Sequence, residues 1–294
     1  MDRNENEEAD NVMSEAQQAS AAEEQASSAR YAKYVLFVLI LVYIFNFIDR
    51  QILSILAEEI KADLGIGDAE IGFLYGTAFA VFYAVFGIPL GRLADMWNRK
   101  KLISMGLSFW SVMTAMSGFA QNFSSLAFCR FGVGVGEASA TPAAFSMLSD
   151  YFSPKVRATV LAIYSSGIYL GSGIGLFLGG AIVHSWHGWY PDPTLAPLGI
   201  KAWQAAFLAV GLPGIFMAIW VWTLREPVKG ASEGILTPAH PAPFQAAGKS
   251  LMSVLPGFSI ASLYVAGGLR AVVINLVVAT LIGLLFYCLY LVMP

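Results

Sequence analysis

The sequence alternates between long apolar segments and short polar ones. Six apolar segments before residue 226 contain at most two charged residues each: 34–57, 71–90, 102–120, 125–148, 158–183 and 202–224. The apolar core of a bilayer is about 30 Å thick, and only a helix of about 20 apolar residues crosses it with every backbone group bonded. The pattern therefore predicts an all-α integral membrane protein with a six-helix transmembrane domain over residues 31–227.

The remainder of the chain continues this pattern less regularly. Residues 228–250 form a polar, Pro/Gly-rich segment that we expect to be a cytoplasmic linker, and residues 251–294 are apolar again. Pro256 and Gly257 argue against a single straight helix there. We expect a surface-lying or re-entrant helix followed by about one further transmembrane helix from Ala271. We also expect the chain to be truncated, because it provides only one six-helix half.

Composition supports a membrane protein and excludes several functions. Hydrophobic residues make up 57% of the chain and charged residues 13%, whereas soluble domains are roughly 25% charged. The apolar segments contain no nucleophile with its base and no metal-ligand spacing, and Gly132, Gly134 and Gly136 follow no strand, as a phosphate loop would require. We therefore expect no enzyme activity, no metal, no cofactor and no nucleic-acid partner.

The distribution of charge predicts the orientation in the membrane. Residues 1–30 are acidic and lack the apolar core of a signal peptide, so we expect a disordered tail. Only Lys61 and Lys201 lie near span ends on one side. The other side carries Arg30, Lys33, Arg92, Arg99, Lys100, Lys101, Lys155, Arg157, Arg225 and Lys229. The positive-inside rule predicts a multi-pass protein of a plasma or inner membrane with a cytoplasmic N-terminus.

Four ionisable residues lie within the predicted spans. These are Asp49 and Arg50 in the first span and Arg130 and Glu137 in the fourth. A charged side chain at membrane depth costs about 2.5–3.5 kcal/mol on insertion scales, so each needs a partner or a water-filled cavity. Arg130 and Glu137 are seven residues apart and share a helix face. Two acids facing one cavity suit proton coupling, whereas a static salt bridge is the alternative interpretation, above all for Arg130.

The loop between the second and third spans contains a recognisable motif. Gly91, Asp95, Arg99 and Lys100 lie in the sequence Gly-Arg-Leu-Ala-Asp-Met-Trp-Asn-Arg-Lys-Lys. This motif resembles the loop signature of the major facilitator superfamily, although Met96 and Asn98 depart from it. The resemblance implies that Asp95 caps a neighbouring helix and that the loop controls conformation. The alternative is that a short cytoplasmic loop collects basic residues by the positive-inside rule alone.

A second motif occupies the fifth span. Gly171, Gly175, Gly179 and Gly180 have the small-xxx-small spacing that permits close helix packing. It resembles a motif that the same superfamily associates with antiporters, although Leu176 stands where that motif has proline. Tight packing without any transport role explains the glycines equally well.

Three further segments narrow the resemblance to the Spinster group of the superfamily. They are residues 46–50, residues 130–138 and residues 150–157. The resemblance implies the N-terminal half of a major facilitator fold, with Asp49 and Glu137 as proton-linked acids and Arg50 and Arg130 as their partners. It implies secondary transport of a lipid-like or organic-anion substrate across the bilayer, driven by protons and completed by a missing second half. The alternative is a non-transporting half-carrier or membrane scaffold.

Overall fold

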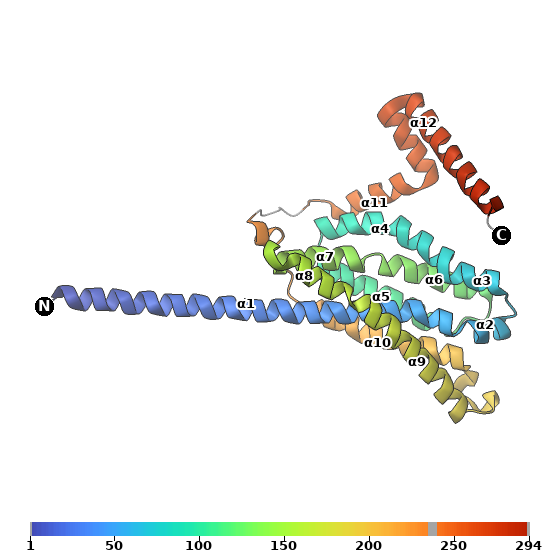
Figure 1. Ribbon diagram of the computed structural model, residues 1–294, viewed down its shortest axis with the longest axis horizontal. Helices are drawn as coiled ribbons and strands as arrows, with labels where there is room; N and C mark the ends of the chain where they lie inside the picture. Colours follow the sequence, from blue (N-terminus) through green and yellow to red (C-terminus); the bar gives the residue numbers. More distant parts are fainter. Residues whose placement is uncertain (1, 235–239, 293–294) are drawn as a thin grey trace.

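The structure consists of helices and loops. The computed structural model describes the backbone of residues 2–234 and 240–292, and this part of the chain contains no strand (Figure 1). The α-helices are α1 (Asp2–Ile55), α2 (Ala57–Leu64), α3 (Asp68–Gly72), α4 (Ala78–Met96), α5 (Arg99–Ser117), α6 (Phe123–Glu137), α7 (Ala140–Tyr151), α8 (Pro154–Ser165), α9 (Gly167–Trp189), α10 (Ala202–Thr223), α11 (Pro243–Val254) and α12 (Pro256–Val292). The predicted all-α architecture is confirmed.

Several helices join end to end into longer rods. A π-helical turn, Phe73–Thr77, connects α3 to α4, and α8 runs into α9. Five stretches in the described chain are long and apolar enough to cross a membrane: Ser28–Ile55, Asp68–Met96, Pro154–Trp189, Ala202–Thr223 and Ser259–Leu285. The predicted third and fourth spans fall outside this set. The third, α5, begins with three basic residues, and the fourth is interrupted at residues 138–139, between α6 and α7.

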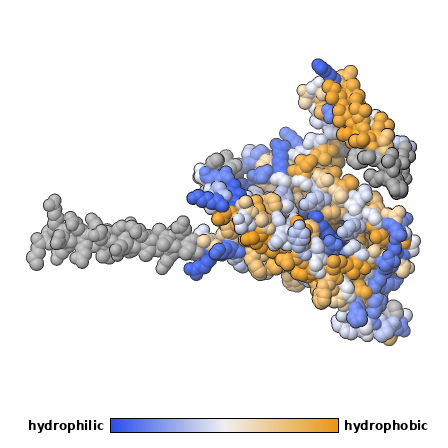
Figure 2. Space-filling view, viewed as in Figure 1, coloured by the Kyte–Doolittle hydropathy of each residue, from blue (hydrophilic) through white to orange (hydrophobic). Residues whose placement is uncertain are grey.

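The bundle packs around α1 and α5. In Figure 1, α1 passes through the bundle, and it packs closely along α9, while α5 packs along both α10 and α6. Buried side chains such as Leu39, Trp110 and Phe207 form the core. Large apolar residues on the outer surface, including Phe177 and Phe216, are about three-quarters exposed. Figure 2 shows such hydrophobic surface over the bundle, as expected for a protein solvated by lipid.

The N-terminal segment differs from the predicted disorder. The backbone of α1 is helical from Asp2, so the acidic segment extends the first span as one continuous rod (Figure 1). Its Ala, Glu and Gln residues are strong helix formers. The helical span beyond residue 28 serves as the nucleus, so this segment extends an existing helix and does not have to nucleate its own. Composition alone predicts disorder because the segment has too little apolar surface to pack.

The segment after the bundle contains a docked helix. Within the predicted linker 228–250, α11 begins at Pro243, and it packs on α4. The Arg92 guanidinium donates to Ser250 Oγ at 2.9 Å, and the Phe244 ring lies 4.9 Å from the Trp97 ring, centre to centre. Beyond it, α12 bends at Gly268, whose φ of 65° interrupts the helix. The chain therefore folds back on itself within α12, as Figure 1 shows.

A glycine stripe lets α9 approach α1. A Cβ atom at Gly171 would lie 2.6 Å from the Ile44 carbonyl oxygen, and one at Gly179 would lie 2.7 Å from Ile55 Cδ1. Gly167 and Gly175 also face α1, so the stripe follows i, i+4 spacing along one face of α9. Among the described residues no atom lies within 4 Å of the Cβ position of Gly180, so Gly167, rather than Gly180, completes the stripe that faces α1.

This stripe predicts a large difference between neighbouring glycines. We expect Gly171→Val to force α9 away from α1 and to destabilise the protein by about 1–3 kcal/mol, as overpacking does. Gly180→Val is the matched control, because the added side chain meets open space, and we expect its melting temperature to stay close to that of the wild type. Thermal unfolding in detergent, followed by tryptophan fluorescence, measures both. Equal melting temperatures for the two variants would contradict the role of the stripe.

Candidate functional site

The four buried ionisable residues form two crossed pairs between α1 and α6. Arg130 of α6 binds Asp49 of α1, with its guanidinium 3.3 Å from Asp49 Oδ1. Arg50 of α1 binds Glu137 of α6, with Nε 2.7 Å from Glu137 Oε2. Asp49 and Arg50 are adjacent, so on a helix they point about 100° apart and reach different partners. Each helix thus contributes one acid and one base.

The Asp49–Arg130 pair is embedded in polar and aromatic groups. Thr114 Oγ1 donates to Asp49 Oδ2, and Arg130 donates to Ser117 Oγ at 3.1 Å. The guanidinium carbon of Arg130 also lies 5.0 Å from the centre of the Phe207 ring. Sequence reasoning missed these three partners, because short hydroxyls and a phenyl ring in apolar spans resemble ordinary packing residues.

The Arg50–Glu137 pair lies among aromatic rings. The guanidinium carbon of Arg50 lies 4.8 Å, 4.6 Å and 5.0 Å from the ring centres of Phe47, Phe79 and Tyr83. Glu137 is fully buried, and its Oε1 has no hydrogen-bond partner among the described residues. A buried carboxylate oxygen without a hydrogen bond is energetically costly, which sets Glu137 apart from an ordinary packing residue.

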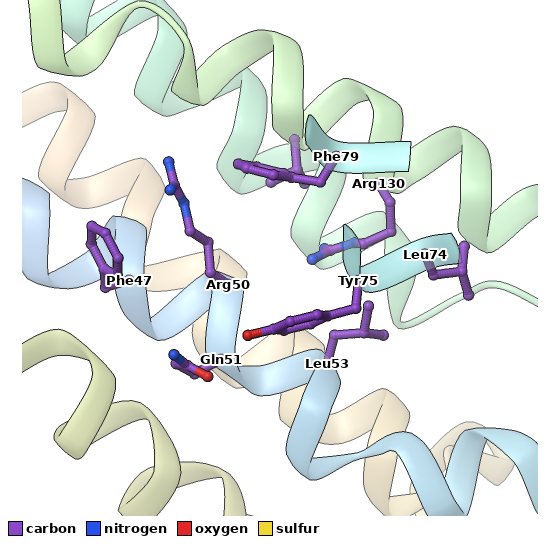
Figure 3. Close-up of a pocket in the computed structure, with 9 residues that line it drawn as sticks. Phe47, Arg50, Gln51, Leu53, Leu74, Tyr75, Phe79 and Arg130 are labelled. Atoms are coloured by element: carbon purple, nitrogen blue, oxygen red, sulfur yellow. The ribbon is translucent and has the colours of Figure 1, made fainter. Parts of the chain in front are cut away.

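A cavity of about 270 Å³ opens beside the two pairs. Figure 3 shows its lining, and Arg50 and Arg130 both contribute to it. Phe47, Leu53, Leu74, Tyr75, Phe79 and Val133 supply most of the remaining surface. Asp49 and Glu137 do not line the cavity, in contrast to the predicted pair of acids facing it. The two arginines, rather than the acids that they bind, line the cavity, so its wall presents positive charge next to aromatic and aliphatic surface.

Arg99 of the loop motif is the centre of a buried network. Its side chain is fully buried and donates to Asp150, to Glu226 Oε1 at 2.8 Å, to both oxygens of Ser146 and to the Pro227 carbonyl oxygen. Every guanidinium nitrogen therefore has a partner. The network joins α5 to α7 and to the segment after α10, which sequence spacing could not show.

Glu226 also caps the start of α5. Its carboxylate accepts from the backbone N–H of Arg99 at 3.1 Å and of Lys100 at 2.9 Å. Carboxylates favour this position because the first N–H groups of a helix have no partner within the helix and carry partial positive charge. The Lys100 ammonium donates to the Leu224 carbonyl oxygen at 2.5 Å. The basic cluster therefore anchors the loop to the end of α10.

The remaining motif residues take less part in this network. A Cβ atom at Gly91 would lie 3.7 Å from Pro142 of α7, which is an ordinary contact distance, so alanine would fit here without a clash. Asp95 is exposed, and the Lys229 ammonium donates to its backbone carbonyl oxygen at 2.7 Å. Its carboxylate has no hydrogen bond or ion pair within the described residues. The helix capping that the motif implies is thus not made inside this part of the chain.

Three comparisons place these features in a family. The profile of the Major Facilitator Superfamily matches residues 39–294. An MFS-type efflux pump of Mycolicibacterium smegmatis is 36% identical over 181 residues, covering 62% of this chain and 39% of the pump. Protein spinster homolog 1 of Homo sapiens is 32% identical over 235 residues, covering 78% of this chain and 42% of that protein. The chain thus spans about two-fifths of the length of these relatives.

A solved structure shares the fold. A bacterial homologue of the human lysosomal transporter Spinster, in an inward-facing and occupied conformation, superposes with a TM-score of 0.63 at 38% identity. The match covers 69% of this chain and 46% of that one. The profile match, the Spinster-like relatives and the shared fold agree with the motifs on α4, α6 and α9. The chain belongs to the Major Facilitator Superfamily.

Proposed function

We propose that this six-helix bundle is the N-terminal half of a proton-coupled secondary transporter that works by alternating access. Together with a second six-helix bundle it moves a lipid-like or organic-anion substrate across a plasma or inner membrane, with its N-terminus in the cytoplasm. The observation that carries the proposal is the pair of crossed, buried acid–arginine contacts at the wall of a central cavity. Secondary transporters bind substrate and coupling ions at such midplane sites.

The crossed arrangement supports coupling because each pair can be broken by a proton. If Glu137 gains a proton, Arg50 loses its charged partner and turns toward the cavity it already lines. The same holds for Asp49 and Arg130. Protonation of an acid on one helix thus frees an arginine on the other and removes one of the two charge contacts between α1 and α6.

The lining of the cavity supports an amphiphilic substrate with an anionic group. Two guanidinium groups can bind a carboxylate or a phosphate through paired hydrogen bonds. The Phe47, Tyr75 and Phe79 rings beside them offer surface for an apolar body. An anion that binds an arginine also competes with the acid that holds it. Substrate and proton are therefore expected to act on the same pairs.

Infrared spectroscopy tests the protonation step directly on this chain. Samples in nanodiscs are titrated with acid, and the C=O stretch of protonated carboxyl groups is recorded as a difference spectrum. We expect a band that disappears in Glu137→Gln and is retained in Asp68→Asn. Asp68 is an exposed acid that pairs with Lys61, 2.8 Å away, and it serves as the matched control.

One outcome would favour the alternative of a non-transporting fragment. A static salt bridge holds its proton state across the whole accessible pH range. If the spectra of wild type and Glu137→Gln agree at every pH while both proteins remain folded, Glu137 is a structural group. The coupling mechanism then fails, although the family assignment stands.

A further inference from the structure

A second cavity, of about 310 Å³, lies at the opposite end of the bundle from the basic loop. It is formed by α2, the end of α9, the loop that follows α9 and the start of α10, at the right in Figure 1. It shares no lining residue with the central cavity. We refer to it as the peripheral pocket. Its position separates it from the buried pairs on α1 and α6.

The walls of the peripheral pocket are aromatic. Trp186, Tyr190 and Trp203 line it, and the rings of Trp186 and Tyr190 are 5.0 Å apart, centre to centre. Hydrogen bonds hold both indoles in place. Trp186 Nε1 donates to the Ile200 carbonyl oxygen at 3.1 Å, and Trp203 Nε1 donates to Asp63 Oδ2 at 2.9 Å. Both indole N–H groups of the pocket wall are thus bonded within the protein.

The pocket also carries net negative charge. Two acidic residues and two basic residues line it: Glu59, Asp63, His187 and Lys201. Lys201 pairs with Asp63, and His187 Nε2 lies 2.9 Å from Glu59 Oε1. With the imidazole neutral, two carboxylates and one ammonium leave a net charge of −1. Glu59 is therefore the acid without a full positive partner.

We propose that the peripheral pocket binds a quaternary ammonium group. The faces of tryptophan and tyrosine rings attract cations whose charge is spread over methyl groups, and such groups lose little hydration on entering an aromatic pocket. Glu59 supplies the counter-charge, and Asp63 is held by Lys201 and Trp203. A strongly hydrated ion such as sodium gains less from these walls. The chemistry thus selects a methylated organic cation.

Tetramethylammonium chloride tests the proposal as a probe. It is titrated against sodium chloride at constant ionic strength into the chain in phosphatidylglycerol nanodiscs, and tryptophan fluorescence reports binding. We expect a saturable change in the wild type. Glu59→Gln weakens binding by at least about tenfold, because it removes the counter-charge to a desolvated cation. Glu58→Gln is the matched control, since Glu58 is 85% exposed and pairs with Lys61 outside the pocket.

A second pair of variants keeps the test valid if Glu59→Gln fails to fold. Trp186→Leu removes one wall and is expected to abolish the fluorescence change, whereas Trp189→Leu, three residues further along α9, preserves it. Size-exclusion chromatography and circular dichroism establish that each variant is folded. A non-saturable response in the wild type overturns the proposal. Wild-type affinity in folded Glu59→Gln and Trp186→Leu overturns it as well.

The same titration distinguishes two sources of the cation. Two further series use nanodiscs that hold the same fraction of phosphatidylglycerol, with phosphatidylcholine or phosphatidylethanolamine as the remaining lipid, so that the surface charge is equal. A weaker apparent affinity with phosphatidylcholine means that the choline headgroup competes and is itself a ligand. Equal affinity in the two mixtures means that the pocket takes a free solute. Either result supports the quaternary ammonium site.

Discussion

Glu137→Gln is expected to abolish the proton dependence of transport in the complete carrier that contains this bundle. The variant keeps the size of the side chain and a hydrogen-bond acceptor for Arg50, which lies 2.7 Å from Glu137 in the wild type. Glutamine has no titratable group, so Arg50 faces the same neutral partner at every pH. We expect uptake driven by a pH gradient to fall by at least about tenfold, as for other groups that act through protonation. Proteoliposomes containing a pH-sensitive dye measure both substrate and proton flux.

Counterflow in the absence of a pH gradient provides the control for this result. Exchange of labelled for unlabelled substrate needs the conformational cycle but no net proton movement, so Glu137→Gln is expected to retain it. Asp49→Asn is expected to behave in the same way through its contact with Arg130. Normal gradient-driven proton flux in both variants would show that Glu137 and Asp49 do not couple protons to transport.

Arg99→Met is expected to destabilise the protein by about 3–5 kcal/mol. Arg99 is fully buried, and its removal leaves Asp150 and Glu226, which are 12% and 20% exposed, without their shared positive charge. The Ser146 and Pro227 carbonyl oxygens also lose their donor. Methionine fills a similar volume, so the loss is mainly electrostatic rather than a cavity effect. Unfolding by increasing sodium dodecyl sulfate in mixed micelles measures the change.

Arg157→Met is the matched control for this substitution. Arg157 pairs with Glu233, which is about half exposed, so solvent screens the contact, and we expect a loss of about 1 kcal/mol or less. Restoring the charge balance in Arg99→Met by adding Asp150→Asn is expected to recover part of the stability. If Arg99→Met and Arg157→Met lower the free energy of unfolding by the same amount, the buried network around Arg99 does not stabilise the fold more than an exposed ion pair does.

The sequence was informative about elements and much less so about partners. Apolar length predicts four of the six spans, because each must cover the same thickness of hydrocarbon. The predicted third and fourth spans are not among the described helices that are long and apolar enough to cross a membrane. Helical periodicity placed Arg130 and Glu137 on one face, as the structure confirms, since both reach toward α1. It could not say which acid pairs with which arginine, because that depends on the rotation and depth of α1 against α6. These are set by packing over the whole bundle.

The basic loop illustrates the same limit. The motif predicts that Arg99 and Lys100 belong to a loop that controls conformation, and the alternative is a short cytoplasmic loop that collects basic residues by the positive-inside rule. Arg99 is instead buried, because Asp150 and Glu226 come from segments distant in sequence and converge on it. The glycine stripe shows an intermediate case. Spacing predicted three of its members, and only the position of α1 showed that Gly167 belongs to it and Gly180 does not.

The crossed pairs have a consequence for how the protein is assembled in the cell. Arg130 and Glu137 both lie in α6, which has 15 residues. On insertion scales a charged residue at the centre of a helix costs about 2.5–3.5 kcal/mol, so α6 is a poor substrate for the translocon on its own. Asp49 and Arg50 of α1, synthesised earlier, offer the opposite charges. We therefore expect insertion of α6 into the membrane to require that α1 is still beside the translocon.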